Sequence, residues 1–210
     1  MTASALPPPV PADRCPGAWP LTCLWIAAAS GVLGLAATLG GWLPQSLIWH
    51  VGHWPQAPWT LWTAALVHFL PAHGLANALA LAALAALGAA LGASRRDALA
   101  LLLAWPLGTL ALLRWPQVGG YYGLSLLIHA ASAVLAVRAL ASARTRWLGL
   151  LLAGGLCIKL ALERGWRVPV GFDSGWGFNV VFAAHLSGAV AGAALALTLA
   201  LVGLCLPVRR

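Results

Sequence analysis

Polar residues that could support catalysis recur at helical spacing inside otherwise apolar stretches of the chain. His73 and Asn77 are four residues apart, and Ser125 and His129 repeat that spacing. Residues at i and i+4 lie on the same face of a helix, so the members of each pair can act together. His185 lies in a third apolar stretch. Because burying a polar group without a partner costs free energy, each of these residues needs a structural or functional reason.

These side chains are the types that a serine hydrolase uses. A serine hydroxyl is a weak nucleophile until a neighbouring base removes its proton, and histidine is the usual base. The tetrahedral intermediate then needs hydrogen-bond donors aimed at its oxyanion, and an imidazole and an amide can supply them. The structural alternative is that the serine bonds back to its own helix and that each histidine pairs with a backbone carbonyl or a neighbouring helix.

Composition indicates an integral membrane protein. Of 210 residues, 61% are hydrophobic and 8% are charged, whereas a soluble domain carries about 25% charged residues. Apolar runs of about 20 residues recur, which is long enough to cross a hydrocarbon core, and lipid forces such runs to be helical. The net charge of +8 is spread in small groups at the ends of these runs, unlike the basic stripe of a nucleic-acid-binding protein.

The apolar runs predict an all-α membrane protein with six transmembrane helices. Residues 1–20 form a Pro-rich cytoplasmic tail that we expect to be flexible, and residues 207–210 form a basic cytoplasmic end. Between them, residues 21–206 form the membrane domain. Its expected spans are Leu21–Leu43, Pro71–Gly92, Asp97–Leu113, Leu124–Leu140, Trp147–Glu163 and Phe178–Leu206.

Residues 44–70 form a long connection between the first two spans. The segment is rich in Trp and His and has no formal charge, so it is too polar to span and too apolar to be a free loop. Tryptophan favours the membrane–water interface, and we expect the segment to lie there. The residues that suggest this are Trp49, Trp54, Trp59 and Trp62.

The distribution of basic residues predicts the orientation of the bundle. One set of span ends carries Arg14, Arg95, Arg96, Arg138, Arg144, Arg146, Arg209 and Arg210. The opposite connections carry Arg114 and a mixed set of Glu163, Arg164, Arg167 and Asp173. By the positive-inside rule, both termini are then cytoplasmic.

With this orientation, the second, fourth and sixth spans all run from outside to inside. The candidate catalytic side chains then lie in one layer, in the outer half of the bilayer. We find no carboxylate in this layer, so the sequence predicts a dyad of Ser125 and His185 rather than a Ser-His-Asp triad. Gly188 and Gly192 follow His185 at i+3 and i+7, which predicts a smooth stripe for close helix packing. An inverted-repeat transporter is disfavoured because no internal repeat is visible.

The ordered set of these motifs resembles the rhomboid intramembrane serine proteases. The segment WTLWTAALVHFLPAHGLAN, residues 59–77, is similar to the rhomboid stretch that enters the second span and carries H-x-x-x-N. The segment GGYYGLSLLIHA begins like the rhomboid G-x-S-G motif, through Gly123 and Ser125. The segment AHLSGAVAGA is similar to the sixth-span motif H-x-x-G-x-x-x-G, through His185, Gly188 and Gly192.

The resemblance, which covers residues 59–206, implies a six-transmembrane-helix rhomboid-like bundle and a role for each motif residue. Ser125 would be the nucleophile, and His185 would be its general base and later acid. His73, Asn77 and the backbone amide of Ser125 would bind the oxyanion. His129 would pack against His185 and hold its ring orientation.

Within the family, the chain most resembles the rhombosortase branch. That branch tends to carry a histidine four residues after the serine, as His129 does, and a Lys-x-x-x-Glu pair, matched by Lys159 and Glu163. We expect a structural role for this pair, since its members lie one helical turn apart.

The branch resemblance also implies a substrate and a location. It implies cleavage of exported proteins at a C-terminal sorting tail, made of a Gly-Gly-type small-residue motif, a transmembrane helix and a basic end. The expected partners are membrane-anchored proteins with such helix-breaking tails and the lipid bilayer, with no nucleic acid. The expected location is the bacterial cytoplasmic (inner) membrane, with the active site toward the periplasmic side.

One residue departs from the family pattern and keeps a second function open. Leu126 follows Ser125 where the family usually has glycine, and a larger side chain there can crowd the oxyanion site or the packing of the fourth span. The alternative is therefore a non-catalytic rhomboid-like protein that binds membrane helices. For His68, in the connection just before the second span, we expect a structural or water-organising role.

No cofactor or metal is expected. A haem or metal protein that uses His68, His73, His129 and His185 leaves the Gly123-x-Ser125 motif unexplained. The cysteines are scattered without C-x-x-C spacing and are interpreted as small apolar residues, at positions Cys15, Cys23, Cys157 and Cys205.

Overall fold

The computed structural model describes residues 17–41 and 45–205, with side chains up to residue 202. Several sequence-based predictions lie outside these residues. They are the tail over residues 1–16, the basic end over residues 207–210, and the charges of Arg14, Arg209 and Arg210.

The described chain is mostly helical, as the sequence predicts. The longer helices are α1 (Ala18–Gly40), α3 (Pro71–Ala90), α4 (Arg95–Leu110), α5 (Ser125–Leu140), α6 (Arg146–Glu163) and α7 (Phe182–Cys205). The short elements are α2 (Thr60–Thr63) and the 3-10 turns η1 (Gln45–Leu47), η2 (Ala64–Leu66) and η3 (Ala111–Arg114). Two small antiparallel pairs join β1 (Trp49–His50) to β2 (Gly120–Tyr121) and β3 (Gly171–Asp173) to β4 (Phe178–Val180).

Four helices in the described ranges are long and apolar enough to cross a membrane. They are Ala18–Gly40, Pro71–Ala90, Arg95–Arg114 and Phe182–Val202. These helices fit a membrane-embedded helical protein. The predicted fourth and fifth spans form the helices α5 and α6. However, α5 has 16 residues, and α6 carries the charged side chains of Arg146, Lys159 and Glu163.

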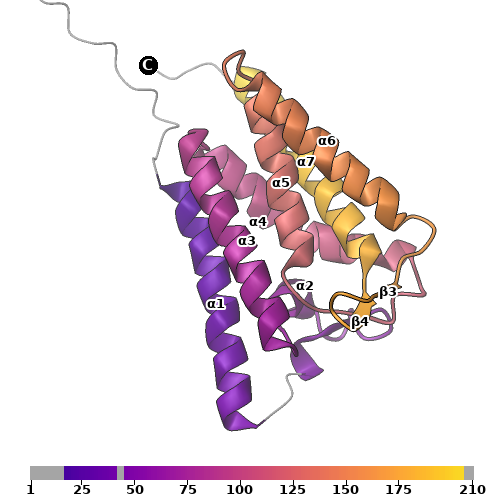
Figure 1. The fold of residues 1–210 in the computed structure, drawn as a ribbon. Helices are drawn as coiled ribbons and strands as arrows, with labels where there is room; N and C mark the ends of the chain where they lie inside the picture. Colours follow the sequence, from indigo (N-terminus) through magenta and orange to yellow (C-terminus); the bar gives the residue numbers. More distant parts are fainter. Residues whose placement is uncertain (1–16, 42–44, 206–210) are drawn as a thin grey trace, which may run out of the picture.

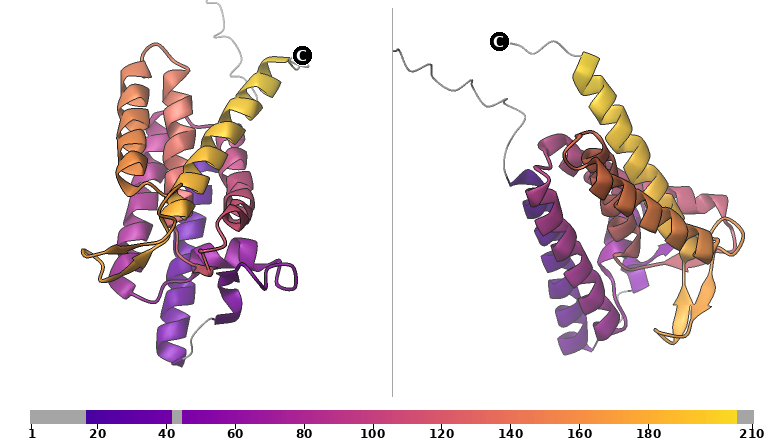
Figure 2. Two further views of the ribbon diagram at one scale, coloured as in Figure 1. Left: turned by 90° about the vertical axis from the view of Figure 1, so that its right-hand side faces the viewer. Right: turned by 45° about the horizontal axis from the view of Figure 1, so that its top comes forward.

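The long helices run up and down through the bundle (Figure 1). The helices α3, α5 and α7 all begin at the end where α2 and the β3–β4 hairpin lie, and α6 ends there (Figure 1). The central helix is α5, which contacts α3, α4, α6 and α7, while α1 packs along α3. Figure 2 shows that α7 crosses the bundle obliquely. The predicted common layer for the second, fourth and sixth spans therefore corresponds to one end of the bundle.

Three helix boundaries differ from the predicted ones. The helix α1 begins at Ala18, three residues into the part expected to belong to the tail. The helix α4 begins at Arg95 rather than Asp97, because Ser94 and Asp97 form a capping box that satisfies the first backbone N–H groups. The helix α7 begins at Phe182 rather than Phe178, because residues 178–180 pair with β3 instead of joining the helix.

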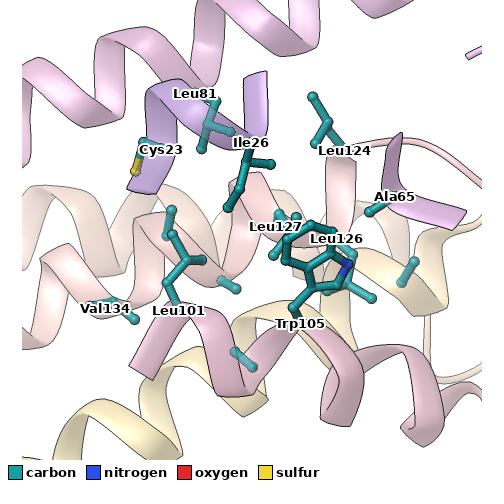
Figure 3. Packing of buried hydrophobic residues seen from close by; sticks show 14 of the residues in the cluster. Cys23, Ile26, Ala65, Leu81, Leu101, Trp105, Leu124, Leu126, Leu127 and Val134 are labelled. Atoms are coloured by element: carbon teal, nitrogen blue, oxygen red, sulfur yellow. The ribbon is translucent and has the colours of Figure 1, made fainter. Parts of the chain in front are cut away.

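The apolar core lies where α1, α3, α4 and α5 face one another (Figure 3). Ile26 of α1, Leu81 of α3, Leu101 of α4 and Leu127 of α5 are all fully buried. The cysteine prediction is confirmed for Cys23, which is unpaired and buried among these apolar side chains (Figure 3).

The connection over residues 44–70 is packed into the protein more firmly than the sequence suggests. Trp49 is 0% exposed and pairs through β1 with Tyr121 of β2, so the prediction that its ring faces the membrane–water interface is wrong. Trp59 and Trp62 are about half exposed, in agreement with an outward-facing position. The segment thereby fixes the loop that precedes α5.

The contact between α5 and α7 depends on two glycines. A Cβ added to Gly188 would lie 2.2 Å from the backbone carbonyl oxygen of Leu126, and one added to Gly192 would lie 2.5 Å from that of Ala130. No real Cβ makes contacts this short. The predicted smooth stripe is therefore confirmed, and it brings the backbone of α7 against α5 just below His185.

Candidate active site

The predicted site residues gather at the end of the bundle where α3, α5 and α7 begin (Figure 1). His73 and Asn77 lie in the first two turns of α3, and Ser125 is the first residue of α5. His129 is one turn further along α5, and His185 is in the first turn of α7. Asn77, His129 and His185 are buried at 8%, 6% and 5% exposure, so their polar atoms must find partners within the protein.

The rings of His129 and His185 are stacked. Their centroids are 4.1 Å apart and their planes differ by 9°. Nδ1 of His129 lies 2.7 Å from the backbone carbonyl oxygen of Ser125. A carbonyl oxygen only accepts, so this Nδ1 carries a proton and donates it. The contact predicted between His129 and His185 is therefore present, and His129 in turn is held by the backbone of the candidate nucleophile.

A carboxylate reaches the site, contrary to the sequence-based prediction. Oε2 of Glu163 lies 2.8 Å from Nδ1 of His185, and Oε1 of Glu163 lies 2.6 Å from Nζ of Lys159. The predicted Lys159–Glu163 pair is thus present, but its carboxylate is shared with the histidine of α7. The prediction that no carboxylate lies in this layer is wrong, because the turn after α6 returns the chain so that the last residue of α6 faces the first turn of α7.

The Ser125 hydroxyl lies beside the hydroxyl of Tyr121. Among the described residues, Ser125 makes no hydrogen bond to His185. The backbone N–H of Ser125 also has no hydrogen-bond partner within this part of the chain. It is one of the N–H groups that the first turn of a helix leaves unsatisfied, and it is therefore available to an anion.

Tyr121 is a site residue that the sequence analysis missed. Its hydroxyl donates to the carbonyl oxygen of Gly123 and lies 3.3 Å from the backbone nitrogen of Leu126, whose N–H it accepts. Burial raises the pKa of the Tyr121 phenol above its usual range, so the hydroxyl stays protonated as a donor. These two hydrogen bonds of the Tyr121 hydroxyl fix the backbone on either side of Ser125, at Gly123 and at Leu126. The aromatic pair Tyr121-Tyr122 beside the serine was the available signal.

Gly123 adopts a backbone conformation that favours glycine. Its φ angle is 101°, and its N–H donates to the carbonyl oxygen of Ala64 at 2.9 Å. An L side chain rarely adopts such a φ angle. A glycine at this position therefore allows the preceding loop to deliver Ser125 to the N-terminus of α5.

His68 is the centre of a second polar cluster. Its Nε2 lies 3.0 Å from Nδ2 of Asn77 and 3.3 Å from the backbone nitrogen of Leu124. Its Nδ1 lies 3.1 Å from Oγ of Ser30, whose hydroxyl donates to the carbonyl oxygen of Leu66. These contacts join α1, α3 and the N-terminus of α5 through one imidazole, in agreement with the expected structural role.

The partners of His68 fix its protonation. The N–H of Leu124 can only donate, so Nε2 of His68 is unprotonated, and Asn77 must present its NH₂ group to the same atom. The proton of the neutral ring is then on Nδ1, facing Ser30. Burial, with a smaller contribution from His73, lowers the pKa of His68 from 6.5 to about 4, so the ring is neutral at pH 7.

Asn77 also bonds to His73. Its Nδ2 lies 3.2 Å from Nε2 of His73, which is therefore the accepting nitrogen. The neutral His73 ring then carries its proton on Nδ1, and this N–H has no partner among the described residues. Of the predicted oxyanion donors, Nδ1–H of His73 and the backbone N–H of Ser125 have no partner among the described residues, while Asn77 holds His73 in place.

Leu126 fits into the bundle because a glycine faces it. Leu126 is 0% exposed, and a Cβ added to Gly108 of α4 would lie 3.0 Å from its Cδ2 atom. Its side chain is thus directed at α4. The sequence predicted that a large residue at this position can crowd the oxyanion site or the helix packing. Gly108 relieves the crowding of the helix packing.

The β3–β4 hairpin covers His73. The ring centroid of His73 lies 4.9 Å from that of Trp176 and 5.1 Å from that of Phe178, both in edge-to-face geometry. A pocket of about 290 Å³ opens beside them, lined also by Phe69, Leu70, Tyr122 and Gly177. The pocket lies beside the first turn of α3, next to His73, and it is large enough for one side chain.

His129, Glu163 and His185 bring potential metal-ligand atoms within 4.8 Å of one another. A histidine binds a metal through a lone pair in the plane of its ring. The planes of His129 and His185 are nearly parallel, so their in-plane lone pairs do not converge on one ion. Each ring already directs Nδ1 at a protein oxygen. The arrangement suits proton transfer better than metal binding.

No model of a protein family matches the chain, and no curated protein matches it.

Proposed function

We propose that the protein is a rhomboid-like intramembrane serine endopeptidase of the rhombosortase type. In this proposal α5 and α6 also cross the membrane, giving six spans. Both termini are cytoplasmic, and the site opens toward the periplasmic side of a bacterial inner membrane. The substrates are membrane-anchored proteins with a Gly-Gly-type C-terminal tail.

The observation that carries the proposal is the convergence of Ser125, His129, His185 and His73 at one end of the bundle. Three helices bring them together, and His129 links the backbone of Ser125 to the ring of His185. A packed apolar bundle has no structural need for so many polar groups at one end. Catalysis by serine supplies a reason for each of them.

In the proposed reaction, Ser125 attacks the scissile carbonyl carbon while Nε2 of His185 takes the serine proton. The carbonyl oxygen gains negative charge and accepts hydrogen bonds from the N–H of Ser125 and from Nδ1–H of His73. His185 then gives its proton to the leaving amine nitrogen as the C–N bond breaks. A water molecule hydrolyses the acyl-enzyme by the same steps, with His185 as the base.

The hydrogen bond between Ser125 and His185 has to form in the complex with substrate. Catalytic hydrogen bonds are often long in free enzymes and tighten only when substrate is bound. For this step the Ser125 hydroxyl has to leave its hydrogen bond with Tyr121 and turn toward His185. Small residues in the substrate favour unwinding of its helix, which exposes the scissile carbonyl to Ser125.

The first test uses a probe that needs no knowledge of the natural substrate. A fluorophosphonate forms a bond from phosphorus to the oxygen of an activated serine and releases fluoride. We expect labelling of the wild type in membranes and none of Ser125→Ala or His185→Ala. The matched control is Ser132→Ala on the same helix, since the Ser132 hydroxyl donates to the carbonyl oxygen of Ile128 and is not in the site.

The second test is cleavage of a co-expressed reporter that ends in a Gly-Gly-type tail. We expect the wild type and Ser132→Ala to cleave it and both dyad variants to fail, at equal membrane levels. Cleavage by Ser125→Ala would contradict the proposal. If the wild type neither cleaves a panel of tails and helices nor reacts with the fluorophosphonate, the proposal is overturned and the alternative, a non-catalytic rhomboid-like protein that binds membrane helices, is favoured.

A further inference from the structure

The contact between Glu163 and His185 has no part in a simple Ser-His dyad. Glu163 is the last residue of α6, and its side chain is 12% exposed. A buried carboxylate is strongly disfavoured unless it is paired. Lys159 already pairs with one oxygen of this carboxylate, at 2.6 Å. The other oxygen faces the imidazole of His185, although the pair with lysine would be complete without it.

The geometry of this contact selects one form of the imidazole. A carboxylate oxygen 2.8 Å from Nδ1 of His185 accepts a hydrogen bond from Nδ1–H. Nε2 of the neutral ring is then unprotonated and can act as a base. The stacked ring of His129 blocks rotation of the His185 ring on one face. Tautomer and orientation are thus both set before substrate binds.

We propose that Glu163 completes a Ser-His-Glu triad with Ser125 and His185, as the positioning residue for the histidine. The proposal rests on the proposed function of the site. Lys159 is assigned a second role, as the cation that keeps the carboxylate ionised.

The chemical steps balance without protonation of the carboxylate. When Ser125 attacks, its proton moves to Nε2 of His185 and the ring becomes an imidazolium. Glu163 keeps its negative charge and stabilises this cation through the Nδ1–H bond. When the C–N bond breaks, the Nε2 proton passes to the leaving nitrogen, and the ring is neutral again. The proton on Nδ1 stays in place throughout.

The pH dependence of the reaction should report this arrangement. Within the described ranges, the titratable groups coupled to His185 are His73 from α3, His129 from α5 and Glu163 from α6, and Lys159 acts on both His129 and Glu163. Removing the Glu163 carboxylate removes a negative charge that favours the protonated form of His185. Removing the Lys159 ammonium removes a positive charge that disfavours this form. The acidic limb of the pH–rate profile should therefore move in opposite directions in the two variants.

The experiment compares Glu163→Gln and Lys159→Met with the wild type in detergent-solubilised full-length protein. The rate of fluorophosphonate labelling and the cleavage of the reporter are both followed as a function of pH. We expect Glu163→Gln to lower kcat by about 10²- to 10⁴-fold with little change in KM, and to move the acidic limb to lower pH. We expect Lys159→Met to move the limb to higher pH.

The matched control is Asp97→Asn, the same chemical change in the capping box at the other end of the bundle. It should leave the pH–rate profile unchanged. Glu163→Asp should recover part of the activity lost in Glu163→Gln, since it restores a carboxylate one methylene further away.

Failure of this inference can be distinguished from failure of the proposed function. If Ser125→Ala and His185→Ala are inactive but Glu163→Gln has wild-type kcat and an unchanged limb, the dyad stands and the triad is overturned. If Ser125→Ala retains activity, the proposed function itself is wrong and the triad with it. Should Glu163→Gln fail to accumulate in the membrane, Lys159→Met decides: an unchanged acidic limb overturns the triad.

Discussion

Asn77 donates to two imidazoles at once, with its Nδ2 atom 3.0 Å from Nε2 of His68 and 3.2 Å from Nε2 of His73. The amide therefore acts as a spacer that holds two neutral rings at the start of α3. In the proposed reaction it leaves the task of binding the oxyanion to Nδ1–H of His73 and the N–H of Ser125. Asn77 then matters for the shape of the site rather than as a direct donor.

Replacing Asn77 by aspartate should destabilise the protein. An ionised carboxylate has no N–H to give, yet Nε2 of His68 must remain an acceptor for the N–H of Leu124. We expect a loss of about 1–3 kcal/mol, the usual cost of leaving buried polar groups unsatisfied. Thermal unfolding in detergent measures it. Asn179→Asp, at an exposed position of β4, is the matched control, and an equal effect of both changes would contradict the assignment.

Stability should fall in mild acid because of His68. The unfolded ring titrates near 6.5 and the folded ring near 4, so the unfolded chain binds the extra proton between these values. Stability from this group is complete above pH 6.5 and is lost as pH falls toward about 4. The expected loss from pH 7 to pH 5 is about 2 kcal/mol. The variant His68→Gln should lose this part of the pH dependence; a slope identical to that of the wild type would refute it.

Adding a methyl group at Gly188 should separate α5 from α7. Its Cβ would lie 2.2 Å from a backbone oxygen, which cannot move aside as a side-chain tip can. We expect Gly188→Ala to lower the unfolding temperature strongly and to abolish serine labelling. Gly155→Ala, where a Cβ meets nothing within 4 Å, should be neutral or stabilise the helix by up to about 1 kcal/mol. Equal tolerance of both substitutions would mean that the helices are not in close contact.

The pair Gly108 and Leu126 should show coupled effects on stability. Leu126→Gly leaves a void against α4 and should cost about 2–5 kcal/mol. Gly108→Ala should be mildly destabilising in the wild type, because its Cβ would lie 3.0 Å from the Leu126 side chain. In the Leu126→Gly background the same change should be stabilising. A double-mutant cycle of unfolding free energies tests this, and simple additivity would show that the two residues do not pack together.

Removal of Trp176 should expose His73. The indole ring packs edge-to-face on the imidazole at a centroid distance of 4.9 Å. We expect Trp176→Ala to increase the rate at which diethyl pyrocarbonate modifies His73 several-fold. Mass spectrometry of the peptides measures it, with the exposed His53 as an internal reference. An unchanged rate would mean that the hairpin does not cover His73.

Much of the site geometry follows from the sequence through helical periodicity. The i, i+4 spacing in α3 and α5 and the glycine stripe in α7 each depend only on the geometry of one helix. The alternating direction of the helices then places the starts of α3, α5 and α7 at one end. These features could be predicted because they need no knowledge of how the connections fold.

The missed features all depend on connections. Glu163 meets His185 because of the irregular segment after α6, whose course local patterns do not determine. Phe178 looks like the start of a span, since its apolar surroundings do not distinguish a strand from a helix. Trp49 is buried because β1 pairs with β2, and a tryptophan suits an interface as well as a core. In each case the structure depends on a contact that local sequence patterns do not determine.

Glu163 is the last residue of α6, and most side chains of this helix are exposed. Of the α6 residues, all of which are described, Gly149 alone is buried, and Ile158 and Leu162 are 63% and 77% exposed. The helix packs mainly on α5. In the proposed function, a substrate helix that enters past α6 displaces it from α5 and draws the Glu163 carboxylate away from His185. The proposed triad then re-forms only after α6 has returned, so a helix that makes only brief contact in the membrane is not cleaved.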